Sequence, residues 1–435
     1  MRTNEKNRPK QSAVGESSVK RASLAAAAVL ATVFHARLAP AQHALRNSIE
    51  AQAAAQERLS GFESQPYTFK AGDFRLLFLP SLGFDWNDNV TLSKSQAEDD
   101  FIFRSVAALR ASYPVTQKNL LQLNVTVGYD KYFQHVELSR VRVSSGSELS
   151  FDVFVKDIWI NLHDRIRYSQ DSATEAAVAN TAHYGIFQNT AGLSASRDLK
   201  DMRFSAGYDH QNNLSTSSQF EYRDNASEMV FARAGRQFLP TLTAGVEGTG
   251  AFTTYDQNFL NDSTAYSAGI YGDWKPGHFF SLAPRFGYAV YDFQQTSPFI
   301  KAENQRTWYF DVTARHALTD AISYSLSSGH EVRLGIESDL IDDWYLRPAV
   351  NWKLRNNLDL NAHFSYEHGK LSGGKLGRAS EDTYDWYVSG LSLAYAVAKN
   401  VTVNVSYRLT FRASDVASRD YAQSLVGLSV TYKPK

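Results

Sequence analysis

Residues 401–412 read V-T-V-N-V-S-Y-R-L-T-F-R, and this stretch decides the fold. Its apolar side chains occupy every odd position from Val401 to Phe411, and its polar side chains occupy every even position from Thr402 to Arg412. Successive side chains of a β-strand point to opposite faces, so a period of two predicts a strand. The stretch is longer than the about 5–6 residues of a globular strand and suits a tilted membrane-spanning strand of roughly 9–11 residues. It therefore predicts one face toward lipid and one toward an aqueous lumen.

The same alternation recurs along the chain from residue 73 onward. It is clear in residues 73–90, 101–113 and 119–134, and again in residues 344–354, 358–367 and 421–432. It is weaker in residues 184–197 and 222–236, so the register there stays open. The strands near the C-terminus carry large apolar or aromatic residues on the predicted outer face, with polar residues between them. The chain thus repeats one unit, a long half-polar strand.

Two kinds of connection alternate between these strands, nine long and eight short. The long polar connections are 89–100, 135–143, 170–182, 215–219, 256–261, 294–304, 337–341, 370–381 and 413–418. The tight turns are 114–118, 156–157, 198–201, 238–240, 275–277, 318–320, 355–357 and 398–400. Neither a β-sandwich nor a propeller sorts its loops by length in this way. We therefore predict an all-β fold: one transmembrane antiparallel up-and-down β-barrel of about 18 strands, with short periplasmic turns and longer extracellular loops.

The N-terminal residues predict export from the cytoplasm. A basic segment precedes the short apolar core 22–34 and the cleavage signal Ala39-Pro40-Ala41, so residues 1–41 are interpreted as a signal peptide. We expect residues 42–72 to form a periplasmic arm or short helix, and residues 73–435 to form the barrel. The chain has no cysteine, and no apolar run long enough for a transmembrane helix follows the signal. The predicted location is the outer membrane of a Gram-negative bacterium.

The segment from Pro80 to Ser93 reads P-S-L-G-F-D-W-N-D-N-V-T-L-S. It resembles a β-barrel porin family of bacterial outer-membrane proteins, whose first strand ends in an aromatic–x–D-N–aliphatic segment. Here that segment is carried by Asp88, Asn89 and Val90. The family is often associated with exopolysaccharide loci, so the resemblance implies a porin that supports polysaccharide export. Outer-membrane barrels typically end in an aromatic residue, whereas this chain continues three residues beyond Tyr432.

Charged residues at predicted lumen-facing positions are the candidates for solute selection, because charges that line a pore set its field. The alternative is that they pair with one another and hydrate. Inward aromatic side chains could stack on sugar rings or merely pack against the barrel wall. The charged candidates are Arg104, Arg110, Arg165, Arg315, Arg333, Arg347, Arg408, Arg412, Asp311 and Glu331, and the aromatic candidates are Trp159, Tyr271, Tyr291, Tyr309 and Tyr345.

Two other chemistries have weaker support in the sequence. The acidic runs 98–100 and 339–343 are candidates for cation binding, but they lack EF-hand spacing and are better interpreted as solvated loop charge. No motif of a serine hydrolase, zinc protease or nucleotide-binding loop is present. An outer-membrane lipase or protease built on His210, with Asp209 and Ser215 nearby, remains the third hypothesis. We therefore predict no catalytic residues, no metal site and no cofactor.

The favoured function is a porin-like channel for hydrophilic solutes, with exopolysaccharide export as its specific version. The main rival is a structural or adhesive barrel whose lumen is closed by loops such as 170–182 and 370–381. The expected partners are outer-membrane lipid and lipopolysaccharide, the barrel-assembly machinery and, in the export version, polysaccharide export components. Lys and Arg number 45 and Asp and Glu number 45, so nucleic acid is not an expected partner.

Overall fold

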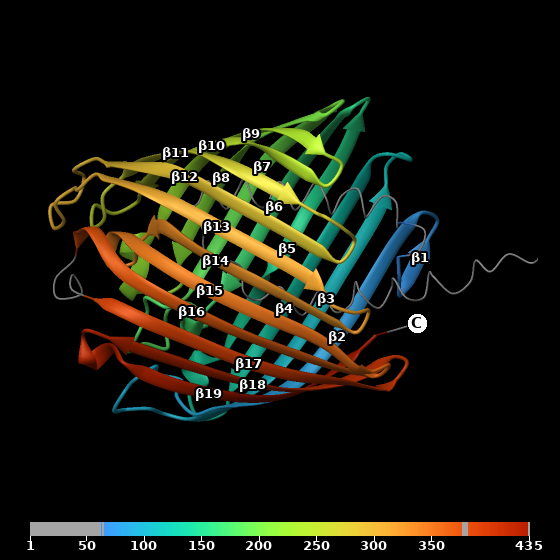
Figure 1. The fold of residues 1–435 in the computed structure, drawn as a ribbon. Coiled ribbons are helices and arrows are strands. Elements are labelled where there is room, and N and C mark those ends of the chain that lie inside the picture. The colour runs from blue at the N-terminus through green and yellow to red at the C-terminus, as the bar shows by residue number, and fades with distance from the viewer. Residues whose placement is uncertain (1–61, 63–64, 376–381, 434–435) are drawn as a thin grey trace, which may run out of the picture.

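The chain forms a closed antiparallel β-barrel of 18 strands (Figure 1). The computed structural model describes residue 62 and residues 65–375 and 382–433. Each strand from β2 to β19 pairs with its neighbours in chain order, and β19 pairs with β2 to close the ring. Both β2 and β19 have their chain-terminal ends on the side where the eight short turns lie, which we call the short-turn rim. The opposite end is the long-loop rim. The strand count of about 18 is confirmed.

The strands run from 12 to 18 residues in length, as a tilted membrane-spanning barrel requires. They are β2 (Phe74–Asn87), β3 (Asp100–Pro114), β4 (Leu120–Tyr132), β5 (Arg140–Val155), β6 (Ile158–Ser169), β7 (Ile186–Leu199), β8 (Met202–Ser215), β9 (Asn225–Leu239), β10 (Leu242–Tyr255), β11 (Ser263–Trp274), β12 (Phe280–Phe293), β13 (Gln305–Ala317), β14 (Ile322–Leu334), β15 (Ser338–Arg355), β16 (Leu358–Lys375), β17 (Thr383–Ala398), β18 (Val401–Ser414) and β19 (Tyr421–Tyr432). Short 3-10 turns lie in the long loops at Val136–Leu138 (η2), Ser172–Thr174 (η3), Ser218–Arg223 (η4) and Ala417–Arg419 (η6). Among the described residues, no helix has the length and apolar character to cross a membrane.

The faces of β18 are those that its alternation predicts. Val405 and Phe411 are 50% and 44% exposed on the outer wall, whereas Thr410 and Arg412 are fully buried on the inner side. The outer face of β18 continues onto its neighbours, because Val405 lies directly across from Leu393 of β17 and from Leu428 of β19. The register is also continuous through residues 184–236, where the alternation alone was too weak to fix it.

One predicted long connection is wrong. Residues 337–341 were expected to be a loop, but β15 begins at Ser338, and only residues 335–337 join β14 to β15. Of the two acidic residues there, Asp339 lies within β15 and accepts a hydrogen bond from Asn261 over 3.0 Å, and Glu337 pairs with Arg419 at 2.7 Å. Likewise β16 extends to Lys375, beyond the predicted start of the 370–381 loop. β15 and β16 therefore extend farther toward the long-loop rim than the polarity of their sequence indicates.

The predicted signal peptide and most of the predicted arm lie outside the described residues. Within the arm, Phe69–Ala71 forms the short strand β1, which pairs with Phe74–Leu76 of β2. Because β3 occupies the other edge of β2 from Arg75 to Asn87, β1 covers the edge that faces β19. β1 pairs nearer the short-turn rim than Ser81, the last residue of β2 that pairs with β19. No long unpaired edge of β2 is therefore left at this rim.

Candidate functional site: the lumen and its inward loop

Residues 170–185, which connect β6 and β7, fold into the barrel rather than away from it. We call this segment the inward loop. Its residues Ala176, Ala177 and Val178 are buried in one cluster with Leu371 of β16 and Trp386 of β17. In a ring of 18 strands, β7 and β16 are nine positions apart and so lie on opposite walls. The inward loop therefore crosses the lumen and narrows it in the half toward the long-loop rim.

Polar contacts hold the far side of the inward loop at several points. Arg412 donates from Nε to the carbonyl oxygen of Ala176 over 2.8 Å, and Arg419 donates to that of Ala177 over 2.8 Å. Both guanidinium groups also pair with the buried carboxylate of Asp382, at 2.7 and 2.8 Å. Withdrawal of the loop would take these two carbonyl acceptors from the guanidinium groups, so the contacts disfavour any arrangement that withdraws it.

Charged side chains of the loop itself make two further anchors. Glu175 pairs with Arg333 of β14 at 3.3 Å, and Asp171 pairs with Arg408 of β18 at 3.4 Å. Burial by itself raises the pKa of Asp171, but the guanidinium groups of Arg408, Arg140 and Arg104 outweigh it and lower the pKa to about 2. Asp171 is therefore ionised throughout the physiological range.

Most of the charged lumen candidates form ion pairs with other side chains along the barrel wall. Arg104 bridges two carboxylates, at 2.9 Å from Asp85 and 3.8 Å from Asp130. Arg165 lies 3.7 Å from Glu148 and 3.9 Å from Asp209. The interpretation that lumen charges pair with each other thus describes this part of the wall.

The remaining candidates divide between paired positions and one exposed position. Arg110 bonds Asn124, Arg347 pairs with Glu367, Asp311 accepts from Tyr345, and Glu331 is buried opposite Asp343. Arg333, Arg408 and Arg412 are anchors of the inward loop, as described above. Arg315, by contrast, is exposed near the short-turn end of β13 and forms no ion pair with any residue that the structure describes. It is the candidate best placed to act on a passing solute.

The inward aromatic candidates pack flat against the wall. Trp159, Tyr291, Tyr309 and Tyr345 are at most 4% exposed, and Tyr271 is 6% exposed. The ring of Tyr309 covers Gly287, where an added Cβ would lie 2.5 Å from the ring, and Tyr345 covers Gly329 in the same manner. A glycine on the neighbouring strand lets an aromatic ring lie on the sheet. These side chains are covered by the wall, and their faces are not free to stack on sugars.

The structure does not bring together the residues of the candidate cation site or those of the candidate hydrolase site. The carboxylates of Asp339, Asp342 and Asp343 turn to three different partners, and no cluster of metal-binding side chains occurs in the described part of the chain. His210 faces outward, as its position in β8 predicts, and bonds Glu228, whereas Asp209 faces inward and bonds His163. The residues of the third hypothesis, His210 and Asp209, therefore face opposite sides of the wall and do not form one site.

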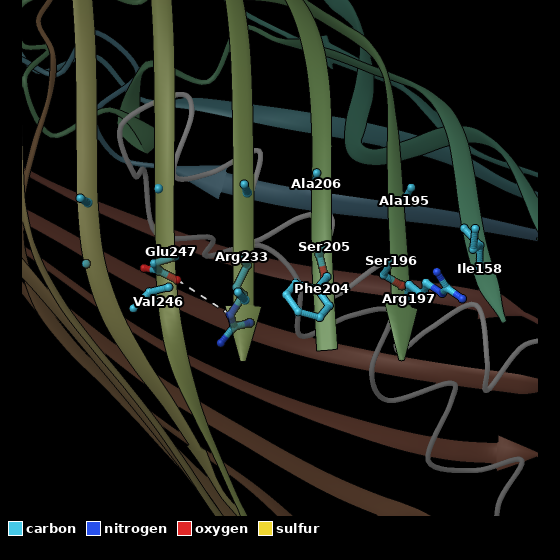
Figure 2. Close-up of a pocket in the computed structure, with 15 residues that line it drawn as sticks. Ile158, Ala195, Ser196, Arg197, Phe204, Ser205, Ala206, Arg233, Val246 and Glu247 are labelled. Carbon is cyan, nitrogen blue, oxygen red and sulfur yellow. Dashed lines mark ion pairs between the residues drawn. The ribbon is translucent and has the colours of Figure 1, made fainter. Parts of the chain in front are cut away.

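A hollow of about 810 Å³ lies on the outer wall and not in the lumen (Figure 2). Its floor is a row of small residues directly paired across β7 to β11, and Ile158, Phe204 and Val246 border it. The row consists of Ala195, Ala206, Ala232, Gly248 and Ala268. An apolar depression on the lipid-facing side has no role in binding a hydrophilic solute.

Comparison with known proteins agrees with this architecture. A model of the family described as "Putative beta-barrel porin 2" matches residues 64–275 and 345–434. The chain belongs to this family. It is thus a porin-like barrel of the outer membrane, with the short-turn rim on the periplasmic side and the long-loop rim outside. The family match includes Asp88, Asn89 and Val90, the residues that carried the resemblance.

The solved structures to which the chain is similar are distant in sequence. OpdK of Pseudomonas aeruginosa, solved with vanillate, is 9% identical over 82% of this chain and 98% of its own, with a TM-score of 0.45. OpdQ of the same species is 10% identical over 83% and 99%, with a TM-score of 0.47. A BenF-like porin from Pseudomonas fluorescens Pf-5 is 11% identical over 82% and 98%, with a TM-score of 0.46. No curated protein sequence matches the chain.

Proposed function

We propose that the protein is a passive channel for hydrophilic solutes, narrowed by the inward loop. The observation that carries the proposal is the contrast between the two halves of the lumen. Toward the outside, the inward loop crosses from β6 and β7 to the opposite wall. Toward the periplasm, many inward positions of the wall that faces it carry small hydrogen-bonding side chains. They are Ser323, Ser325 and Ser327 of β14, Asn351 of β15, Asn361 of β16 and Asn404 and Ser406 of β18.

Oligosaccharide is the solute class that this lining favours. Hydroxyl and amide side chains exchange hydrogen bonds with sugar hydroxyls as they do with water, so a sugar chain passes without a large desolvation cost. This is the support within the chain for the exopolysaccharide version of the proposal. Polysaccharide export components would then be its partners, at the periplasmic mouth.

One feature supports the rival, a barrel that does not conduct. The inward loop makes apolar as well as polar contacts with the far wall, and such contacts suit a permanent closure. Planar-bilayer recording of refolded protein separates the two. Stable conductance supports the channel, whereas no conductance in protein shown to be folded supports the closed barrel. Swelling of liposomes in oligosaccharides of increasing size then tests the solute class.

A further inference from the structure

The family motif lies where the barrel closes. Pairing between β19 and β2 runs only from Ser81 to Asn87 on β2, whereas β18 and β19 are paired from Val401 to Arg412. Beyond Asn87, toward the long-loop rim, the residues of the motif continue the contact between β2 and β19, which we call the closing seam. Asp88 donates from its backbone N–H to the carbonyl oxygen of Ser424 over 3.1 Å, and its carboxylate accepts from the N–H of Ser424 over 2.6 Å. The Asp88 side chain thus replaces a backbone partner of the ladder.

Asn89 completes this closure and is only 2% exposed. Its amide nitrogen donates over 2.8 Å both to the carbonyl of Ser93 in its own loop and to that of Ala422 on β19. Its amide oxygen accepts from the N–H of Ser93 over 3.1 Å. An aspartate at this position would lack the donor, and an alanine would lack every one of these bonds. The asparagine fixes the loop after β2 against β19.

A series of polar contacts also connects Asn89 to the inward loop through β19 and β18. The backbone oxygen of Asn89 accepts a hydrogen bond from Gln423 over 2.7 Å. Gln423 in turn accepts from Arg408 over 3.3 Å, and Arg408 pairs with Asp171 of the inward loop at 3.4 Å. Three polar contacts thus join the motif to the first anchor of the loop.

The next residues of the motif segment touch the inward loop directly. Leu92 is 1% exposed and packs with Ala173, while its carbonyl oxygen accepts from the N–H of Asn180 over 3.0 Å. Leu92 has a φ of 51°, in the left-handed region that non-glycine residues seldom adopt. Val90 is buried in a neighbouring cluster that Ala182 packs against. Asp88 and Asn89 thus contact β19, and Val90 and Leu92 contact the inward loop.

We propose that Asp88–Leu92 positions the inward loop, so that the closing seam of the barrel sets the width of the channel. The effect on transport rests on the proposed function. The position of the inward loop does not, because it depends only on the contacts described above. Asn89 and Gln423 are positioning residues, because they act on the lumen through Arg408 and Leu92 and do not line it.

The test measures the position of the loop and the current separately. The chain has no cysteine, so His183→Cys on the loop and Asp415→Cys beyond β18 allow spin labels at two exposed sites. Pulsed dipolar spectroscopy of refolded protein should give one narrow distance peak. Asn89→Ala and, separately, Gln423→Ala should lose this narrow peak while the barrel stays folded in a heat-modifiability gel. The matched control is Asn119→Ala, which removes the acceptor for the N–H of Phe154 at the short-turn rim and should keep the peak.

Current recording adds the transport readout. Asn89→Ala and Gln423→Ala should give larger and noisier unitary currents than the parent protein, and Asn119→Ala should not. A narrow distance peak retained in both folded variants would overturn the positioning role, whatever the currents are. If the parent protein carries no current, the channel fails, and the distance measurement still decides this inference. Gln423→Ala leaves the seam backbone intact, so it keeps the test valid if Asn89→Ala does not fold.

Discussion

Replacing Val405 of β18 by arginine should destabilise the barrel by about 2–4 kcal/mol, the cost measured for such a residue near the bilayer midplane. Val405 is 50% exposed on the outer wall and lies between Leu393 and Leu428. It is five residues from Asn400 in the periplasmic turn. At about 3.4 Å per residue and a tilt near 40°, this places it about 13 Å up an apolar band about 25 Å tall. Because tenfold corresponds to about 1.4 kcal/mol, the folding equilibrium should fall roughly 30- to 700-fold.

Two neighbouring positions serve as controls. Val403 also faces outward but lies only about 8 Å above the turn, so Val403→Arg should cost less, in the direction of the about 0–1 kcal/mol found near the interface. Asn404 faces the lumen between Ala394 and Ser429, so Asn404→Arg should be mild. Reversible urea titration in lipid vesicles, followed by tryptophan fluorescence, measures all three. Equal costs at 404 and 405, or a larger cost at 403 than at 405, would refute the assigned faces and depths.

Other predictions concern the wall and the lumen. Gly287→Ala should cost about 1–3 kcal/mol in the same titration, because its Cβ would lie 2.5 Å from Tyr309, whereas Gly272→Ala makes only an ordinary contact and should be nearly neutral. A pKa of about 2 for Asp171, below the usual value, means that its ion pair is complete above about pH 4 and is lost as the pH falls through about 2; the difference in unitary current between the parent protein and Asp171→Asn should therefore be the same at pH 8 and at pH 4, and a difference that disappears near pH 6 would contradict this. Arg315→Glu should shift the reversal potential in a salt gradient toward cation preference with no change in stability, and an unchanged potential would exclude Arg315 from selection. Arg412→Met should destabilise the barrel by less than the about 3–5 kcal/mol typical of a buried charge left without a partner, because Arg419 remains 2.8 Å from the Asp382 carboxylate, and a neutral result would show that Arg419 and water replace the lost guanidinium.

The sequence predicted the barrel well because its signals are local. The alternation in β18 reports which face each residue takes, since only the outer face must be apolar. Loop lengths gave the strand number for the same reason, because each turn is local to one hairpin. The prediction was wrong at residues 337–341, where acidic side chains suggested a loop. Asp339 there accepts a hydrogen bond from Asn261, and Asp342 and Asp343 just beyond it pair with His330 and Arg333 on the preceding strand β14. The sequence does not show such partners.

The site was less predictable because its contacts join distant parts of the chain. The inward loop meets Arg412 and Arg419 more than 200 residues later, and no local pattern announces that its residues fold inward. The roles of Asp382 and Glu175 were missed for this reason. The sequence did mark 170–182 as a long loop that could close the lumen, and it marked Arg408 and Arg412 as facing inward. What it did not supply was the connection between the two.

The central claim, a channel narrowed by the inward loop, is tested most directly by single-channel recording of the refolded protein beside a variant in which residues 172–183 are replaced by a short Gly-Ser linker. The parent protein should show small, stable unitary currents, and the variant should show larger ones. Equal currents from the two proteins would contradict the account, because the loop would then not narrow the path. No current from parent protein shown to be folded would contradict it as well.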